Sequence, residues 1–196
     1  TKAELIYFQR SFQLQHRLPV FYGLPKVHKD PVSLRPVVSN TNSFLAIFSV
    51  WLDHKMKSLL PLIRSYVKNS TTIIQELKEL KLPEGAKIFS ADATSMYTNI
   101  DVNLGITTIE DFLQNNEKDL PPQFPSRLFL DILREVMCNN IFTFGETYWL
   151  QLQGTAMGTL SACAYATLTY GHYETLQSFQ SSEISYYTTA ATLMMC

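Results

Sequence analysis

The stretch FSADATSMYTNI (residues 89–100) places an acid at the end of an apolar segment. Residues 86–93 have the composition of a buried strand, and a carboxylate there costs free energy unless it is paired or holds a metal ion. Tyr97 follows Asp92 by five residues and sets an aromatic ring about one turn beyond it. Asp92 is therefore a candidate metal ligand. Capping of the turn that follows is the alternative, because Asp is common in that position.

A second stretch, residues 21–39, gathers basic side chains on or between two short strand-like segments. They are Lys26, His28, Lys29 and Arg35. A hairpin that carries them can reach over a polyphosphate, since Arg makes forked contacts and Lys supplies a point charge. Pro25 and Pro36 restrict the backbone and favour a fixed presentation of these cations. Ordinary solvated cations on an exposed hairpin are the alternative.

The third stretch is LQGTAMGTLSACAYA (residues 152–166), in which Gly154 and Gly158 stand four residues apart. Glycine permits close approach of another backbone, whether of this protein or of a nucleic acid. For the small residues from Ser161 to Ala166 we favour tight packing of a helix. The two glycines are candidates for contact with a ligand, and packing inside the protein is the alternative.

Composition limits the class of protein. The chain has 196 residues, of which 46% are hydrophobic and 17% charged, as expected for one globular domain or one and a half. The longest apolar run, residues 44–52, is too short to span a bilayer, and the start does not resemble a secretory signal. Three widely spaced cysteines favour a reducing compartment over a disulfide framework or a zinc site. We therefore expect an intracellular protein, nuclear or cytoplasmic, that is not secreted.

Charge is distributed unevenly along the chain. Residues 1–70 contain ten Lys and Arg against three Asp and Glu, whereas residues 71–196 contain six against fourteen. A basic part beside an acidic part suits a surface that grips phosphates next to one that holds metal cations. A chance imbalance of solvated charges is the alternative.

The elements that must position these residues can also be predicted. Thr41, Asn42 or Ser43 is expected to cap a helix that runs to about Leu60. Ser70 is expected to cap an amphipathic helix. The other expected elements are a helix within 1–17, strands within 18–30 and 33–39, a strand at 86–93, helices at 103–116 and 126–139, a hairpin at 141–152 that turns near Gly145 and Glu146, and a helix after the glycine stretch. The amphipathic helix is expected to place Ile73, Ile74, Leu77 and Leu80 on one face. This mixture of helices and strands predicts an α+β fold.

In order and spacing the three stretches resemble a reverse transcriptase, specifically the Penelope-like and telomerase-related group. LPKVHK (residues 24–29) and RPVVS (residues 35–39) match the two finger motifs of that family. FSADATSMYTNI matches the palm motif with the first catalytic aspartate, and GTAMGTLSA (residues 154–162) matches the loop that contacts nucleotide and template. The resemblance extends from about Leu18 to Tyr187. It implies right-hand polymerase fingers over 1–85, which are basic and include a helical segment, and a partial palm over 86–196, with no thumb.

The resemblance also implies catalytic roles. Asp92 would bind both catalytic Mg²⁺ (or Mn²⁺) ions, with the backbone carbonyl of Ala93 as a further ligand. Tyr97 would be the steric gate that excludes a ribose 2′-hydroxyl. In such a centre one ion lowers the pKa of the attacking 3′-hydroxyl and the other stabilises the leaving pyrophosphate.

Binding roles follow from the same resemblance. Lys26 and Arg35 would hold the incoming triphosphate and offset the charge that grows on it. Met157 would line the nucleotide pocket. Contacts with the RNA template and the DNA primer are implied for Gly154, Gly158 and Lys29. The implied partners are therefore an RNA template, a DNA primer and a dNTP, with no membrane.

The chain departs from the family pattern at two places. Thr159 and Leu160 stand where a small residue and a proline are usual in the family. The second pair of catalytic acids, in the motif YxDD, is expected just after ISYY (residues 184–187), but residues 188–196 contain no Asp.

The genetic code offers an explanation for the residues after Tyr187. Met194 and Met195 are encoded by ATG and the codon of Cys196 begins with TG, so a shifted frame must read Asp and then Val. The codons before them permit Arg-Arg-Tyr-Ile-Asp, which would complete the expected motif. We hypothesise that residues after about Tyr187 are a frameshifted translation of that strand. A coding sequence in which the Leu193 codon does not end in G would contradict this.

The interpretation that unites these features is a fragment of a reverse transcriptase, an RNA-directed DNA polymerase (a nucleotidyltransferase) of retroelement origin. Because the second acid pair is missing, the chain alone is expected to lack appreciable polymerase activity. The alternatives are a non-catalytic nucleic-acid-binding module and a non-functional frameshifted relic.

Overall fold

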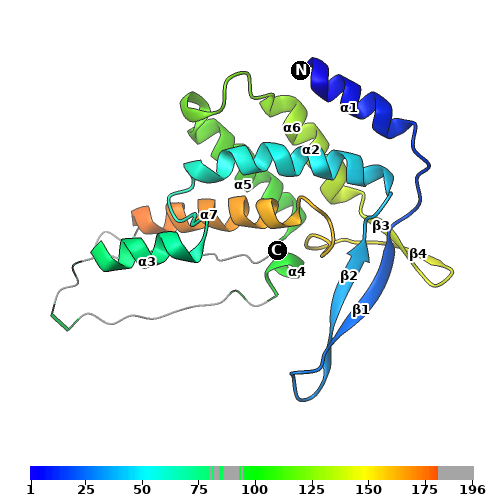
Figure 1. The fold of residues 1–196 in the computed structure, drawn as a ribbon, viewed down its shortest axis with the longest axis horizontal. Coiled ribbons are helices and arrows are strands. Elements are labelled where there is room, and N and C mark those ends of the chain that lie inside the picture. Colours follow the sequence, from blue (N-terminus) through cyan, green and yellow to red (C-terminus); the bar gives the residue numbers. More distant parts are fainter. Residues whose placement is uncertain (80, 82–83, 86–92, 94, 181–196) are drawn as a thin grey trace.

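The computed structural model describes residues 1–79, 81, 84–85, 93 and 95–180, and combines helices with one small sheet (Figure 1). The α-helices are α1 (Lys2–Phe12), α2 (Phe44–Leu59), α3 (Ser70–Glu79), α4 (Met96–Asn99), α5 (Val102–Asn115), α6 (Ser126–Cys138) and α7 (Ala162–Gln180). Two 3-10 helices, η1 (Leu60–Leu62) and η2 (Glu117–Asp119), follow α2 and α5. The strands are β1 (Val20–Lys26), β2 (Ser33–Ser39), β3 (Ile141–Phe144) and β4 (Thr147–Leu150). The predicted α+β class is confirmed.

Helix α2 begins and ends where the sequence predicts. The Ser43 hydroxyl accepts a hydrogen bond from the Ala46 amide at 3.0 Å and so satisfies a donor that the helix start leaves free. At the other end, Pro61 lies in η1, where the α-helical pattern has stopped. The cap expected from Thr41, Asn42 or Ser43 is thus provided by Ser43.

The start of α3 differs from the prediction by one residue. The Asn69 side chain, and not that of Ser70, accepts hydrogen bonds from the Thr72 amide at 3.0 Å and from the Thr72 hydroxyl at 3.2 Å. The expected cap at Ser70 is therefore wrong, because Asn69 also has a short side chain that reaches the free amides and stands one position earlier. On the expected apolar face, Ile74 and Leu77 are exposed. Leu80 lies outside the described residues.

Helices α5 and α6 confirm the predictions for 103–116 and 126–139 to within one residue at each end. Asp101 caps α5 by accepting a hydrogen bond from the Leu104 amide at 2.8 Å. The strand expected at 86–93 falls almost entirely outside the described residues.

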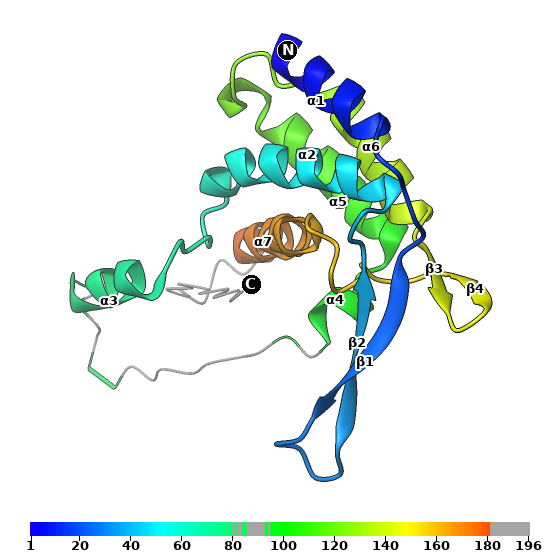
Figure 2. The same ribbon diagram turned by 45° about the vertical axis from the view of Figure 1, so that its right-hand side comes forward.

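The sheet has the strand order β2-β1-β3-β4. Strands β1 and β2 pair antiparallel, from Val20 opposite Ser39 to Lys26 opposite Ser33. Strand β3 joins β1 in parallel through the pair Val20 and Thr143, and pairs antiparallel with β4. Both predicted hairpins are confirmed. The β1–β2 hairpin extends away from the helices (Figures 1 and 2).

The core lies among α2, α5, α6 and α7. Its most deeply buried side chains include Leu52, Met56, Leu59, Ile109, Phe129, Leu133, Tyr165 and Leu168. These come from both sides of the boundary at residue 85 that the resemblance implies, so the described parts of fingers and palm share one apolar cluster. The division into 1–85 and 86–196 stays a prediction. In the part of the chain that the structure describes, no helix is long and apolar enough to cross a membrane.

Candidate functional site

Two of the predicted basic residues lie on one face of the β1–β2 hairpin. Arg35 pairs with Leu24, and Lys26 pairs with Ser33. Because strand residues alternate between faces and directly paired residues share a face, Leu24, Lys26 and Arg35 point to the same side. Lys26 and Arg35 are then diagonal neighbours, roughly 7–8 Å apart at the backbone. A polyphosphate can bridge two cations with this spacing.

The other two basic residues of this stretch lie in the turn beyond the strands. The turn is closed by a hydrogen bond from the Lys29 amide to the Lys26 carbonyl at 3.1 Å. Lys29 and His28 are exposed there. Among the described residues, neither Lys26 nor Arg35 forms an ion pair, so both cations are available to an anionic ligand.

The glycine loop, which we define as residues 153–160, lies against the free edge of β2. The Val38 amide donates a hydrogen bond to the Met157 carbonyl at 2.8 Å. Gly158 has a φ of +113°, and a Cβ atom there would overlap the Val38 carbonyl oxygen and lie 3.5 Å from the Val37 side chain. Val37 is two residues beyond Arg35 on the same face of β2. Gly158 therefore lies beside the face that carries both cations.

The same loop lies against α4 on its other side. The Gly154 amide donates to the Ile100 carbonyl at 2.8 Å, and the Thr155 amide donates to the Tyr97 carbonyl at 2.7 Å. Gly154 has a φ of +74°, and a Cβ atom there would lie 2.5 Å from the Tyr97 carbonyl oxygen. This close backbone approach fixes α4, and with it Tyr97, next to the loop.

A chain of buried polar side chains joins the loop to the start of α2. The Asn40 side-chain amide donates to the Thr159 hydroxyl at 2.7 Å, and the Ser43 hydroxyl donates to the Asn40 side-chain oxygen at 3.1 Å. Thr159, which with Leu160 departs from the family pattern, has a structural role here, whereas Leu160 is exposed. Asn40 was missed by the sequence reasoning. Its position just before a predicted helix cap was the available signal.

The predicted site residues thus fall into two groups along the hairpin, one toward its tip, where Lys26 pairs with Ser33 beside the turn, and one at its base, where the Val38 amide meets the Met157 carbonyl. Lys26 and Arg35 form one group, and the other comprises Tyr97, Gly154, Met157 and Gly158. Figure 2 shows α4 beside the hairpin base, with the segment that leads into α7 reaching the same place. For both glycines the close neighbour in the structure is protein backbone. Their contact with template or primer stays a prediction.

The structure describes only one of the two predicted metal ligands. Asp92 lies outside the described residues, and Ala93 is exposed. Within the described residues, no three side chains of His, Cys, Asp or Glu type gather in a way that would hold a metal ion. The expectation of Mg²⁺ or Mn²⁺ at Asp92 therefore stays a prediction.

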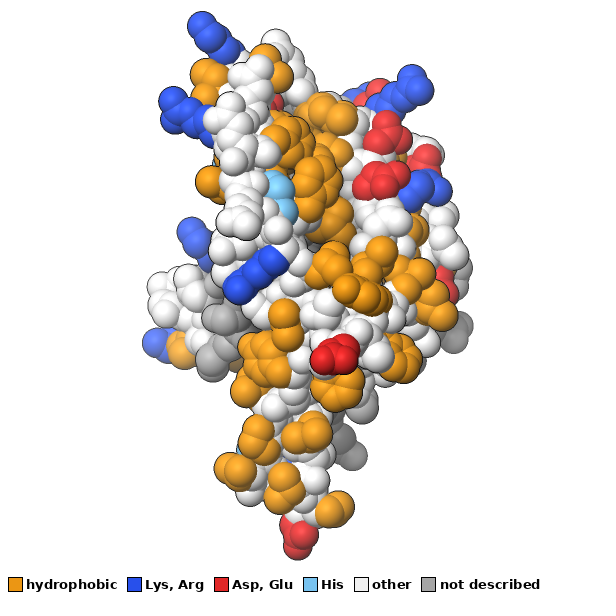
Figure 3. All heavy atoms as spheres, turned by 90° about the vertical axis from the view of Figure 1, so that its right-hand side faces the viewer, with side chains coloured by type: hydrophobic (Ala, Val, Ile, Leu, Met, Phe, Trp, Pro, Cys, Tyr) orange, Lys and Arg blue, Asp and Glu red, His pale blue; other side chains and the backbone are white. Residues whose placement is uncertain are grey.

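The hairpins also expose apolar side chains that the sequence reasoning did not single out. Among them are Tyr22, Leu24, Val27, Val32, Leu34, Phe144, Tyr148 and Trp149. Apolar side chains follow the β1–β2 hairpin toward its tip (Figure 3). Aromatic and apolar groups beside cations suit contact with both the bases and the phosphates of a nucleic acid.

Comparisons of the chain with known protein families, with curated proteins and with solved structures found no match.

The packing of the glycine loop leads to a test of stability. Gly145 (φ +59°) and Gly154 (φ +74°) both have left-handed backbone, but a Cβ atom at Gly145 meets nothing within 4 Å. We expect Gly145→Ala to lower the free energy of unfolding by about 1–2 kcal/mol, the cost of that backbone for alanine. Gly154→Ala adds overlap with α4 and is expected to cost about 3–5 kcal/mol.

Denaturant unfolding of the two variants measures this difference. Equal losses at the two positions would contradict the close contact between Gly154 and α4.

Proposed function

We propose that this chain comprises the fingers and partial palm of a reverse transcriptase of retroelement origin, and that it binds an RNA template paired with a DNA primer. The observation that supports this most is the junction at the hairpin base. The residues that the motifs nominate for triphosphate binding lie farther out toward the hairpin tip, on the strand face whose inner residue Val37 contacts the loop nominated for nucleotide and template. Three stretches that are far apart in sequence meet in this one region.

The proposed roles follow from the positions of the side chains. Lys26 and Arg35 clamp the triphosphate of an incoming dNTP, and Arg35 supplies forked hydrogen bonds that fix its orientation. Met157, which is partly exposed, contacts the base or sugar. Tyr97 is partly buried against the core and is held through its carbonyl by the Thr155 amide. A ring anchored in this way can act as a steric gate.

The proposal includes Mg²⁺ or Mn²⁺, held by Asp92 and the Ala93 carbonyl. Such an ion, when bound, would lower the pKa of the primer 3′-hydroxyl. Residues 188–196, where the resemblance places the second carboxylate pair of a two-metal centre, contain no Asp or Glu. We therefore propose that the chain alone does not polymerise DNA.

A second candidate is a non-catalytic nucleic-acid-binding module. The exposed cations and aromatic rings of the hairpins favour it, because these features bind nucleic acid without a metal ion. If the chain is instead a frameshifted relic, it is not expected to fold stably. A cooperative thermal unfolding transition would count against the relic.

Binding is tested with an RNA/DNA hybrid in a salt titration. We expect Lys26→Ala and Arg35→Ala each to weaken affinity roughly tenfold, because each removes a charge-assisted contact with phosphate. Each is also expected to reduce the slope of log K against log salt concentration by about one. Lys78→Ala and Lys118→Ala remove the same charge from α3 and η2 and are the matched controls. Equal losses in all four variants would contradict a site at the hairpin.

Primer extension tests the chemistry on the same purified protein. We expect no incorporation of dNTP with Mg²⁺ or Mn²⁺, and no difference between the wild type and Asp92→Asn, because one acidic ligand position is not enough to hold two ions. DNA synthesis that is lost in Asp92→Asn would overturn the proposed inactivity and leave the binding site in place.

A further inference from the structure

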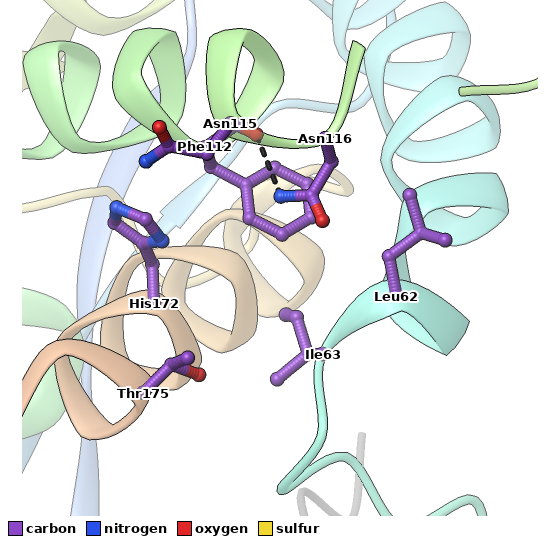
Figure 4. Close-up of a pocket in the computed structure, with 7 residues that line it drawn as sticks. All are labelled: Leu62, Ile63, Phe112, Asn115, Asn116, His172 and Thr175. Carbon is purple, nitrogen blue, oxygen red and sulfur yellow. Dashed lines mark hydrogen bonds between the residues drawn. The ribbon is translucent and has the colours of Figure 1, made fainter. Parts of the chain in front are cut away.

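Strand β4 forms one edge of the sheet, and no other described strand pairs with its outer side. All of its side chains are exposed, and the β3–β4 hairpin projects away from the helices (Figures 1 and 2). The depression in Figure 4 is lined from the helical part of the protein, and none of its lining residues comes from the sheet. The β4 edge thus offers backbone N–H and C=O groups to a further strand, rather than a hollow to a small molecule.

The direction of the backbone groups of β4 follows from one hydrogen bond. The Gln151 amide donates to the Asn140 carbonyl at 3.0 Å, on the side of β3. Because successive residues of a strand alternate in direction, the N–H and C=O of Trp149 also point toward β3, whereas those of Tyr148 and Leu150 point to the free edge. Tyr148 and Leu150 can therefore bond to another strand without loss of a hydrogen bond inside the sheet.

The opposite edge of the sheet is protected against such pairing. The Val38 amide of β2 points outward, and the Met157 carbonyl accepts its hydrogen bond. Pro36 stands two residues earlier, so it also occupies an outward-pointing position, and it has no N–H to offer. Natural edge strands use proline, lysine or a bulge as protection. Residues 147–150 (TYWL) contain neither proline nor lysine, and their pairing with β3 has no bulge.

The charge around β4 favours a second copy of this chain over a nucleic acid. Glu146 is the only charged residue within 139–152, so this segment has no lysine or arginine to contact phosphates. Tyr148, Trp149 and Leu152 are each more than half exposed. Two such surfaces can cover each other's apolar side chains without burying a charge.

The positions of the free backbone groups determine how two copies can pair. Antiparallel pairing about a twofold axis at Trp149 sets Tyr148 of each copy opposite Leu150 of the other, and these are the residues with free N–H and C=O groups. Each Glu146 then lies opposite Leu152, and the two carboxylates stay roughly 20 Å apart along the strands. Salt screens like charges at that separation, so they do not oppose the pairing.

Trp149 is suited to the centre of that pairing. It pairs with Phe142 of β3 and so shares its face of the sheet, and the Phe142 ring lies 5.6 Å from the Phe21 ring of β1, measured between centroids. The Trp149 indole N–H already donates to the Thr147 hydroxyl at 2.7 Å. The ring can therefore be buried against its counterpart without leaving a polar atom unpaired.

We propose that β4 pairs antiparallel with β4 of a second copy of this chain, with Trp149 on the twofold axis, so that the two sheets become continuous. The interface is small, because the strand has 4 residues. We therefore expect a weak dimer, with a Kd on the order of 10–100 µM. The pairing does not depend on the proposed binding of nucleic acid, and its test contains no nucleic acid.

Sedimentation velocity over that range of protein concentration measures the association. The wild type is expected to shift from the monomer mass toward twice that mass as the concentration rises. Leu150→Pro removes an outward-pointing N–H but no hydrogen bond to β3, and is expected to weaken the dimer about tenfold or more. Leu34→Pro makes the same change at an outward-pointing position of β2 and is expected to dimerise like the wild type. A wild type that stays monomeric, or equal weakening by both prolines, overturns the proposal.

Disulfide trapping tests the register, and it decides the matter if Leu150→Pro does not fold. In the proposed pairing the two Cα atoms of residue 149 lie about 4.5 Å apart, within reach of a disulfide. Oxidation of Trp149→Cys is therefore expected to give a dimer linked through this position, which mass spectrometry of the peptides identifies. Thr147→Cys is the control on the same face, because the two copies of that position lie roughly 14 Å apart. Linkage of Thr147→Cys as readily as of Trp149→Cys contradicts the pairing.

Discussion

The backbone of the glycine loop fits between β2 and α4, and the arrangement of the candidate site depends on that fit. On one side the loop receives a hydrogen bond from Val38, and on the other it donates to the carbonyls of Tyr97 and Ile100. Side chains at Gly154 or Gly158 would overlap backbone atoms, so the loop approaches both elements only because neither residue has a Cβ atom. The loop thereby joins the hairpin, α4 and the start of α7.

The helices stabilise the fold, whereas the β1–β2 hairpin offers an exposed surface for a ligand. Helices α2, α5, α6 and α7 bury the apolar side chains that stabilise the fold. The β1–β2 hairpin keeps most of its side chains exposed and, among the described residues, joins the rest of the protein at its base. The buried pair of Asn40 and Thr159 extends that anchor to α2. A rigid base and an exposed, basic arm form an arrangement that suits the grip of a long, charged partner.

Features encoded by local signals were predictable from the sequence. The Ser43 cap, the ends of α5 and α6 and both hairpins follow from side chains close to each element. The cap of α3 was predicted one residue too late, because Asn69 and Ser70 are both good capping residues and the local sequence does not distinguish them. Contacts between distant segments were not predictable in this way: Asn40 meets Thr159 across 119 positions, and no pattern near either residue specifies its partner. The resemblance nominated Tyr97 and Met157, and the fold places both at the loop, whereas the role of Asp92 stays a prediction.

The central claim is that the hairpin face and the glycine loop form one nucleic-acid-binding surface. NMR of the methionine methyl groups and the arginine side chains, during titration with an RNA/DNA hybrid, tests this most directly. The account predicts that the signals of Arg35 and Met157 shift together with a single Kd, while the methyl group of Met56, which is fully buried in the core, does not move. A shift of Arg35 without Met157, or shifts confined to other parts of the molecule, would contradict it.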